Sequence, residues 1–280
     1  MKASLRKFTR VVSFWIMQRY IFSLIILCYL AAPALAQQKP AKVSSVTAKS
    51  NPAPATTPAA SPNPIRDADR LFSHGEDAAR DRQSFQIIEK ALTSEANNFQ
   101  LLWRLARSCY YVGDEASSAD KLRYFERGIE AGQKAVALQP NAVEGHFWLG
   151  ICYGGYSEVK GALKALQTVK KIRAEMETVL RLNSGFEDGN AFLALGEMDR
   201  ELPRMFGGST SRAVSYLEKG LSVAPKNMNL KLALAQAYLD ASRRDEANRQ
   251  LQEILQMQVN PARATEQRSV QDKARRLLSK

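Results

Sequence analysis

The sequence predicts an all-α fold in which helical hairpins stack into a solenoid that a last helix closes. Three observations predict it. From about Asp67 onward, apolar residues recur at helical spacing, without the strict alternation of a strand. Glycine, proline and asparagine interrupt this pattern at intervals. Two short motifs also recur in phase along the chain, which is typical of a repeat protein.

The two motifs are the halves of a helix-turn-helix unit. The first places a small or β-branched residue, then Leu or Val, and then a helix stop. It occurs as "EKALTSEANN", "QKAVALQPNA", "ETVLRLNSGF" and "EKGLSVAPKN". The second occurs as "LARSCY", "LGICYG" and "LAQAYL", with a weaker copy in "LGEMDR". Together they match the tetratricopeptide (TPR) unit of about 34 residues.

The units are irregular. The second and third exceed the standard unit length by about ten residues, and the fourth by about five. We expect the extra residues between the two helices of a unit, in "GDEASSADKLRY", "GGYSEVKGALKALQ" and "LPRMFGGS". The tail from Pro261 predicts a capping helix with a basic outward face. The predicted fold is therefore a TPR-like helical-hairpin solenoid with irregular, lengthened repeats and a C-terminal capping helix.

The N-terminus predicts export. Residues 1–36 have the apolar run of a signal peptide and end in Ala34-Leu35-Ala36, the small-x-small pattern of a cleavage site. We expect a periplasmic or secreted protein. The alternative is an uncleaved membrane anchor, which would be short or would bury Arg19 at a cost of about 3 kcal/mol. The sequence leaves open whether translation starts at Met1 or Met17.

Two further segments follow the predicted signal peptide. Residues 37–65 are rich in Pro, Ala, Ser and Thr and cannot bury enough apolar surface to fold, so we expect a disordered linker. Residues 66–280 form the predicted TPR-like helical domain. They contain 32 basic and 28 acidic residues, so much of the net charge of +12 lies before them. This distribution argues against nucleic-acid binding, and we expect membrane contact only through the signal segment.

Little in the sequence supports an enzyme. It has neither a Gly-x-Ser-x-Gly nor a His-Glu-x-x-His motif. His74 and His146 stand in helical stretches, and no His/Cys set has metal-ligand spacing. We therefore expect no catalytic residue, cofactor or metal site. An oxidising compartment would permit Cys109 and Cys152 to pair, while two buried core thiols are the simpler interpretation.

The concave side of the solenoid is the predicted binding surface. An aromatic-rich groove with one arginine would hold a peptide, a partner helix, or a small apolar or carboxylated ligand. The alternative for its aromatic residues is core between repeats. In the fourth unit the corresponding positions are Asn190, Leu193 and Glu197. The groove candidates are Gln100, Trp103, Arg107, Tyr110, Phe147 and Ile151.

The segment "ELPRMFGGSTSRA" interrupts the fourth unit. We expect Gly207 and Gly208 to supply positive φ angles in a tight turn that opens at Pro203, and Ser209 to cap the next helix. A phosphate-binding loop is the disfavoured alternative, because no strand precedes the glycines and no Lys-Ser/Thr follows them at the required spacing.

This turn carries a family resemblance. The Pro-x-x-x-Gly-Gly turn, with "VLRLNSGFEDGNAFLALGEM" before it and "LALAQAYLDASRRDEANRQLQEIL" after it, resembles the T-component of TRAP transporters, an exported TPR-like family. Eukaryotic regulators of microtubule dynamics share a similar pattern. The resemblance implies a periplasmic solute-binding protein as partner, and oligomers are compatible with it. The alternative function is a general periplasmic TPR adaptor for envelope assembly.

Overall fold

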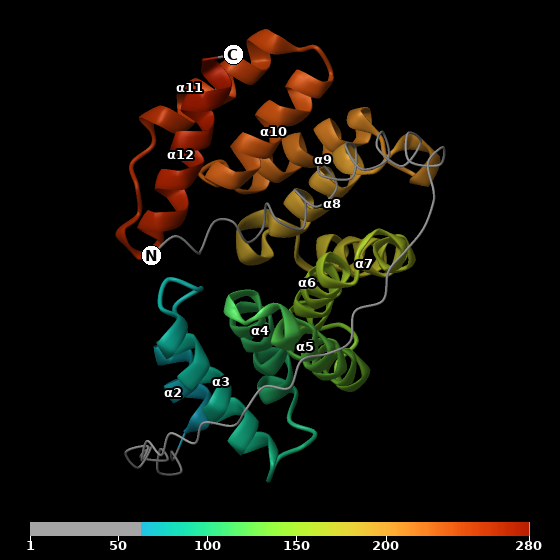
Figure 1. Ribbon diagram of the computed structural model, residues 1–280, viewed down its shortest axis with the longest axis vertical. Coiled ribbons are helices and arrows are strands. Elements are labelled where there is room, and N and C mark those ends of the chain that lie inside the picture. Colours follow the sequence, from blue (N-terminus) through green and yellow to red (C-terminus); the bar gives the residue numbers. More distant parts are fainter. Residues whose placement is uncertain (1–62, 280) are drawn as a thin grey trace, which may run out of the picture.

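The computed structural model describes residues 63–279, which form helices and turns without a strand. The predicted signal peptide and all but the end of the predicted linker lie outside these residues. The described helices pair into antiparallel hairpins that stack in an arc (Figure 1). In order they are α2 (Pro64–Leu71) with α3 (Ala78–Leu92), α4 (Phe99–Glu115) with α5 (Ser118–Leu138), α6 (Val143–Lys160) with α7 (Ala162–Asn183), α8 (Asn190–Glu201) with α9 (Thr210–Val223), α10 (Met228–Asp240) with α11 (Arg244–Gln256), and the closing α12 (Ala264–Leu278). The predicted fold class is confirmed.

The first helix begins two residues before the expected domain boundary at residue 66. The side-chain oxygen of Asn63 accepts a hydrogen bond from the backbone N–H of Arg66 at 2.9 Å, and Pro64 occupies the first turn, where its missing N–H has no cost. Pro64 and Ile65 therefore belong to α2 rather than to the linker.

The extra residues of the second and third units lengthen helices. We expected them to lengthen the connections, but α5 has 21 residues and α7 has 22. Two residues separate α4 from α5, because Ser117 caps α5 at once through the backbone N–H of Asp120. A single residue, Gly161, separates α6 from α7, and its φ of 82° allows the sharp reversal. These hairpins therefore have long helices and short connections.

The helices bury two adjoining apolar clusters, one mainly among α2 to α7 and one among α8 to α12. Within the first cluster, Cys109 and Cys152 are free thiols that both lie close to Gly128. A Cβ at Gly128 would lie 2.5 Å from the Cys152 sulfur, so only glycine allows α5 to approach this closely. Burial raises the pKa of both thiols, which makes them poor nucleophiles.

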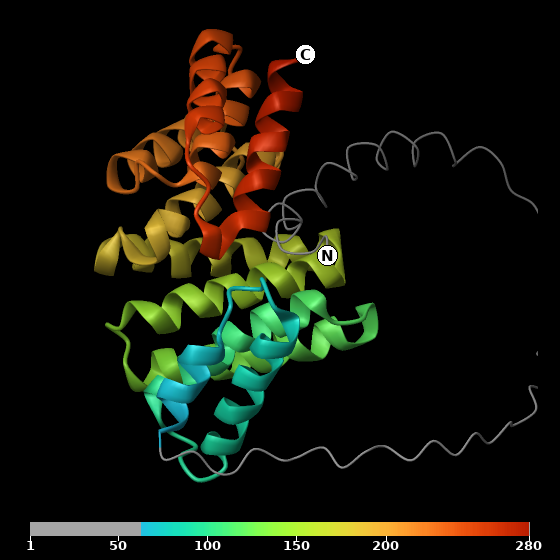
Figure 2. The same cartoon turned by 90° about the vertical axis from the view of Figure 1, so that its left-hand side faces the viewer.

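The two ends of the arc approach one another. The turn after α2 and the beginning of α12 lie close together in both views (Figures 1 and 2). Arg263 and Glu266 accordingly lie within electrostatic range of His74. The stacked units thus enclose an inner face rather than an open trough.

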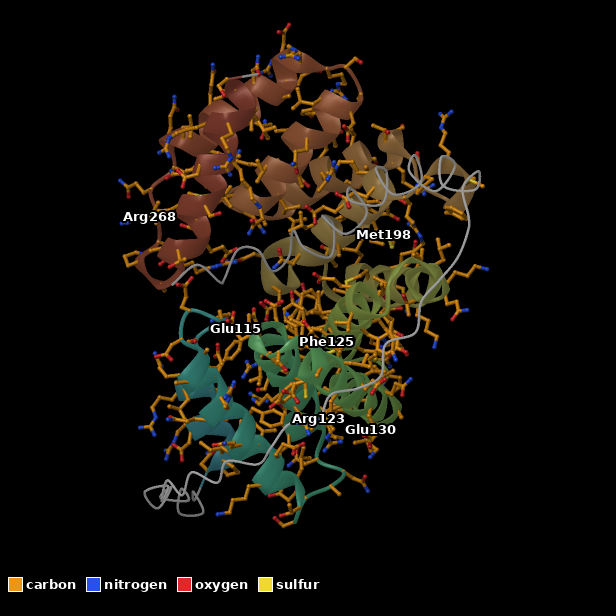
Figure 3. The ribbon with its side chains drawn as sticks, in the orientation of Figure 1. Glu115, Arg123, Phe125, Glu130, Met198 and Arg268 are labelled. Carbon is orange, nitrogen blue, oxygen red and sulfur yellow. The ribbon has the colours of Figure 1, made fainter. Side chains whose placement is uncertain are left out.

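The closing helix α12 has the predicted capping character. Val270 and Ala274 are buried against the preceding units. Arg268, Arg275 and Arg276 are exposed, and Figure 3 shows Arg268 on the outside of α12. The basic outward face expected from the sequence is therefore confirmed. No helix within residues 63–279 combines the length and the apolar composition that crossing a membrane requires.

Candidate functional site

The six groove candidates lie on α4 and α6, the first helices of the second and third hairpins. Gln100 is exposed, and its side-chain oxygen accepts a hydrogen bond from the indole N–H of Trp103 at 3.0 Å. The other five side chains are buried as core between helices, and Phe147 is only 2% exposed. The structure thus places the six on two helices that pack against each other, while a binding role for them stays a prediction. The buried candidates are Trp103, Arg107, Tyr110, Phe147 and Ile151.

Arg107 is committed to an ion pair within the chain. Its guanidinium donates to Asp69 on α2 at 2.6 Å, and Arg104 donates to the same carboxylate at 2.8 Å. Arg107 also lies over the ring of Phe72, with its guanidinium carbon 3.9 Å from the ring centroid. Burial raises the pKa of Asp69, but hydrogen bonds from the two arginines outweigh this effect and hold that pKa below its ordinary value. Asp69 thus holds the Arg107 guanidinium in place, but one carboxylate faces two arginines, so the cluster keeps a net positive charge.

A continuous run of aromatic rings crosses the first three hairpins and reaches the turn that follows them, and we call it the aromatic ladder. Neighbouring ring centroids along it are 4.4 to 6.0 Å apart. Three of the five pairs pack edge to face, a favourable arrangement, and the other two are tilted. Its members come from the end of α2, from α4, from α6 and from the short helix η2 (Phe186–Gly189). In order they are His74, Phe72, Tyr111, Trp148, Phe147 and Phe186.

Trp148 is the one ladder residue with a buried polar atom that lacks a partner. Its indole nitrogen finds no hydrogen-bond acceptor among the described residues, although the side chain is 3% exposed. A buried donor without an acceptor is costly and calls for an explanation. Tyr111, its ladder neighbour, has a pKa raised by burial and by the nearby Glu187 carboxylate.

The ladder ends at a strained turn. Glu187 and Asp188 both adopt left-handed backbone conformations, with φ of 49° and 54°, and Gly189 continues them at 72°. Such a conformation costs an L-residue about 1 kcal/mol or more, and it concentrates at functional sites. The turn is also where α7 gives way to α8, and it brings Glu187 within electrostatic range of α4. Burial raises the pKa of Glu187, while Arg107 on α4 lowers it.

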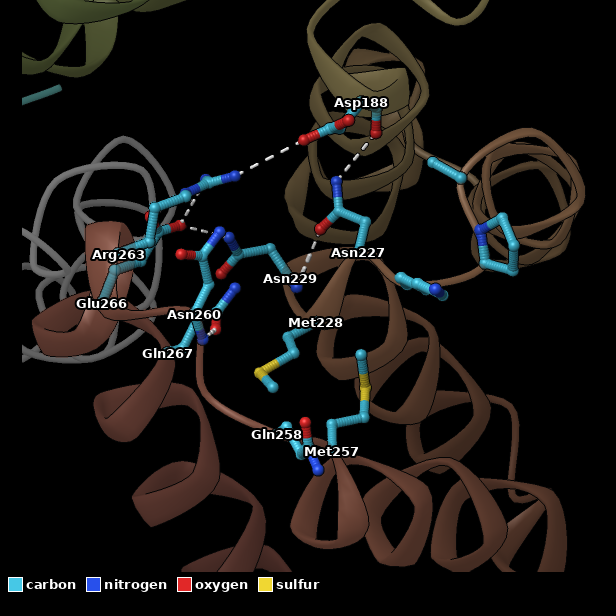
Figure 4. Close-up of a pocket in the computed structure, with 13 residues that line it drawn as sticks. Asp188, Asn227, Met228, Asn229, Met257, Gln258, Asn260, Arg263, Glu266 and Gln267 are labelled. Atoms are coloured by element: carbon cyan, nitrogen blue, oxygen red, sulfur yellow. Dashed lines mark hydrogen bonds and ion pairs between the residues drawn. The ribbon is translucent and has the colours of Figure 1, made fainter.

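A pocket of about 730 Å³ lies beside this turn (Figure 4), and we call it the C-terminal pocket. Arg263 forms part of its wall and pairs with Asp188 at 3.5 Å and with Glu266 at 2.8 Å. Asn227 fixes the backbone here by donating to the Asp188 carbonyl at 2.8 Å. The remaining wall is rich in carboxamides and methionines: Asn229, Gln258, Asn260, Gln267, Met228 and Met257.

Two of the buried acids on helix α8 lie one turn apart. Glu197, an inner-face position of the fourth unit, is 5% exposed, and one carboxylate oxygen finds no hydrogen-bond partner among the described residues. Glu201 pairs with Arg200, which also reaches Asp240 at 3.2 Å. Burial raises the pKa of both acids. The pKa of Glu197 rises to about 7, although the positive charges of Arg200 and Lys273 act in the opposite direction. Glu197 therefore changes its charge near neutral pH.

The Pro-x-x-x-Gly-Gly turn requires glycine at both of its glycine positions, for two different reasons. Gly207 has a φ of 92°, as expected. Gly208 does not have a positive φ; instead, a Cβ there would lie 1.7 Å from the Leu202 carbonyl oxygen. Pro203 holds the turn, because its carbonyl oxygen accepts from the N–H of Gly208 at 3.2 Å. Ser209 caps α9, as expected, through the N–H of Arg212.

A buried carboxylate anchors this turn from α8. The side chain of Asp199 pairs with Arg173 and with Arg212, whose guanidinium also donates to the Gly207 carbonyl. The turn therefore projects from a rigid base. Met205 and Phe206, at its tip, are 82% and 42% exposed, so they extend into solvent.

Both histidines have identifiable environments. One ring nitrogen of His146 lies 2.6 Å from a Glu175 carboxylate oxygen, and the other lies 2.9 Å from the Pro140 carbonyl oxygen. Both nitrogens therefore have hydrogen-bond partners within the fold, which is typical of a structural histidine. His74 is exposed at the end of the ladder. Residues 63–279 contain no group of three or more His, Cys, Asp and Glu side chains that could hold a metal ion.

Comparison with known proteins supports the repeat architecture. A sequence profile of tetratricopeptide repeats matches residues 208–266. The fold is that of a TPR-type solenoid. The solved structure of a thermophilic TPR protein from Thermus thermophilus superposes with a TM-score of 0.56 at 21% identity, over 77% of this chain and 97% of that one. This likeness concerns the fold.

A second profile, that of regulator of microtubule dynamics protein 1-3, matches residues 64–199. Regulator of microtubule dynamics protein 3 of Xenopus laevis is 27% identical over 133 residues, which is 47% of this chain and 28% of that protein. Regulator of microtubule dynamics protein 1 of Bos taurus is 23% identical over 235 residues, 76% of this chain and 70% of that protein. The matching region is thus less than a third of the Xenopus protein's length.

Proposed function

We propose that this protein is an exported binding scaffold whose inner face receives a segment of a partner protein. The aromatic ladder is the observation that carries this proposal. It joins the first three hairpins to the strained turn at Glu187. Trp148 and Phe147 are buried within it, while Phe72, Tyr111 and Phe186 are half-buried and His74 is exposed. A TPR-type fold is a scaffold for protein partners, and aromatic surface is the usual anchor for a bound segment.

The partner that the sequence favours is a periplasmic solute-binding protein of a TRAP-type transporter. Two features of the sequence support this choice, the signal-peptide pattern of residues 1–36 and the Pro203-x-x-x-Gly207-Gly208 turn. A carboxylated small ligand is the weaker alternative, because Arg107 is buried and held by Asp69. A general adaptor for envelope assembly would use the same inner face with a different partner.

The similarity to regulators of microtubule dynamics favours a second candidate, a cytoskeletal partner. The two candidates differ in compartment, so one experiment separates them. Fractionation of the native cells with a specific antibody shows whether the protein lies outside or inside the cytoplasmic membrane. A cytoplasmic pool that co-sediments with microtubules would refute the transporter proposal.

Site-specific photo-crosslinking tests the binding face directly. A photoreactive phenylalanine analogue replaces Tyr111 on the ladder, and the matched control replaces Arg123, which is exposed on α5. We expect a solute-binding protein to crosslink at position 111 and not at position 123. Equal crosslinking at both positions, or none at position 111, would refute the inner face as the binding surface. An envelope-assembly protein at position 111 would support the adaptor alternative.

A further inference from the structure

The C-terminal pocket is electrically balanced. Its volume of about 730 Å³ lies in the range of ligand-binding sites. Two cations line it, Lys226 and Arg263, together with two acids, Asp188 and Glu266, so the formal charges sum to zero. Arg263 bridges the two acids, at 2.8 Å from Glu266 and 3.5 Å from Asp188. The pocket therefore favours neither an anion nor a cation by its charge.

Carboxamides that line the pocket keep unused hydrogen-bonding groups. The side-chain oxygen of Gln267 accepts from the backbone N–H of Asn260 at 2.7 Å, while its NH₂ group has no partner among the described residues. The NH₂ group of Asn229 donates to Glu266 at 2.6 Å, while its oxygen accepts no hydrogen bond from them. Gln258 is exposed and makes no hydrogen bond within the described part of the chain. The pocket thus offers both donors and acceptors.

Hydrogen bonds within the fold hold the walls of the pocket in place. The side-chain oxygen of Asn227 accepts from the backbone N–H of Asn229 at 2.9 Å, and its NH₂ group donates to the Asp188 carbonyl at 2.8 Å. Asn260 opens the short helix η4 (Pro261–Arg263) by accepting from the N–H of Ala262 at 2.9 Å. These bonds fix the turn before α8, the start of α10 and the connection to α12. A preformed site loses less entropy when it binds a ligand.

The lining chemistry matches a peptide main chain. A carboxamide carries a donor and an acceptor, and a backbone amide presents the complementary pair. No aromatic side chain lines the pocket, so it lacks the stacking surface that nucleobases use. Met257 is half-buried and packs against the apolar cluster that contains Met228, and both lie beside the carboxamides in Figure 4. The flexible thioether of Met257 provides adaptable apolar surface for a side chain.

We propose that the C-terminal pocket binds the main chain of an extended, uncharged peptide segment. Gln258 and Gln267 donate to its carbonyl oxygens, the Asn229 oxygen accepts from one of its N–H groups, and Met257 contacts an apolar side chain. None of the ladder residues lines this pocket. The inference therefore goes beyond the proposed function, because it adds a second peptide-binding site outside the aromatic ladder.

Calorimetry with a peptide and its ester analogue tests main-chain recognition. The probe is acetylated, amidated Ala-Ser-Leu-Ser-Ala, titrated into the full chain. In the analogue, ester oxygens replace two central N–H groups, which removes two donors and weakens the adjoining carbonyl acceptors without adding bulk. We expect the probe to bind about tenfold more tightly than the analogue, because each lost hydrogen bond weakens binding several-fold. Maltopentaose, which offers hydroxyl groups in place of amides, should not bind.

Substitutions in the pocket locate the binding. Gln267→Glu removes the NH₂ donor but keeps the oxygen that accepts from Asn260, and Gln258→Ala removes a carboxamide that makes no bond within the fold. The double variant should bind the probe about tenfold more weakly, with thermal unfolding checked by circular dichroism. Gln252→Ala serves as the control, because Gln252 is exposed on α11 and does not line the pocket.

The outcomes separate this inference from the proposed function. No binding of the probe, equal binding of the probe and its ester analogue, or unchanged binding by the double variant would overturn the inference. Binding of maltopentaose alone would indicate a glycan site and would overturn it as well. If position 111 crosslinks to a partner while the probe fails to bind, the proposed function stands and only the pocket inference fails. If the probe binds in the pocket while position 111 yields no crosslink, the reverse holds.

Discussion

Replacing Glu197 with glutamine should make the stability of this protein less dependent on pH. The side chain lies on α8 with 5% exposure, and one carboxylate oxygen has no hydrogen-bond partner among the described residues. Burial raises its pKa from 4.5 to about 7, against the opposing charges of Arg200 and Lys273. Glutamine has nearly the same shape but cannot ionise, so the variant isolates the charge.

The sign and size of the effect follow from these values. A carboxyl whose pKa is higher in the folded protein binds its proton more tightly there than in the unfolded chain. Its favourable contribution is complete below the unfolded pKa near 4.5 and is lost as pH rises through about 7. A shift from 4.5 to about 7 corresponds to roughly 3 kcal/mol. The wild-type protein should lose about that free energy of unfolding between about pH 4 and about pH 8 through this group.

Urea unfolding, followed by circular dichroism across this pH range at constant ionic strength, measures the effect. The stability of Glu197→Gln relative to wild type should increase by roughly 3 kcal/mol from the acidic to the alkaline end. Glu126→Gln, at an exposed position, serves as the control and should show no such trend. A difference between Glu197→Gln and wild type that is constant with pH would refute the reasoning, because Glu197 would then titrate normally.

Four further substitutions test other parts of the structure by thermal and urea unfolding. Gly208→Ala should destabilise the fold by several kcal/mol, because the new Cβ would overlap the Leu202 carbonyl. Gly207→Ala should cost only about 1 kcal/mol, because its surroundings are open and only its positive φ is strained. Equal costs would contradict the different roles assigned to the two glycines. Glu187→Gly should raise stability by about 1 kcal/mol by relieving the left-handed turn, and a loss would show that the turn is unstrained. Asp69→Asn should cost about 2 kcal/mol by leaving Arg104 and Arg107 without their counter-charge, and an unchanged melting temperature would refute that role.

The sequence predicts the architecture well because the motifs mark close helix packing. Leu105, Leu149 and Leu234 repeat at positions that must be buried in every unit, and all three are buried. The extra residues of the second and third units lengthen α5 and α7 instead of the connections, whereas those of the fourth unit lie between α8 and α9 as predicted. Residues such as those of "DEASSADKLRY" are compatible with either a polar loop or an exposed helix face, and only the cap at Ser117 decides between them.

The inner face was harder to predict because it depends on distant segments. Phe72, Glu187 and Arg263 belong to different units and show no common spacing in the sequence. Their meeting depends on the curvature of the stack, which accumulates from small rotations between units. One local signal was available: "NSGFEDGN" combines glycine with Asp and Asn, the residues that tolerate a left-handed backbone. It marks the turn, although not the direction of the Glu187 side chain.

The contact between Arg263 and Asp188 has a consequence for how this chain can change over evolutionary time. Solenoids commonly grow by duplication of a unit, since each unit touches only its neighbours. Here Arg263, just before the closing helix, pairs with Asp188 in a turn that precedes the last two hairpins. Arg263 also lies within electrostatic range of His74 in the first unit. A duplicated hairpin inserted between them would separate both contacts. Units added beyond either end would meet the opposite end of the arc (Figures 1 and 2), so we expect the closed arc to disfavour a change in the number of units.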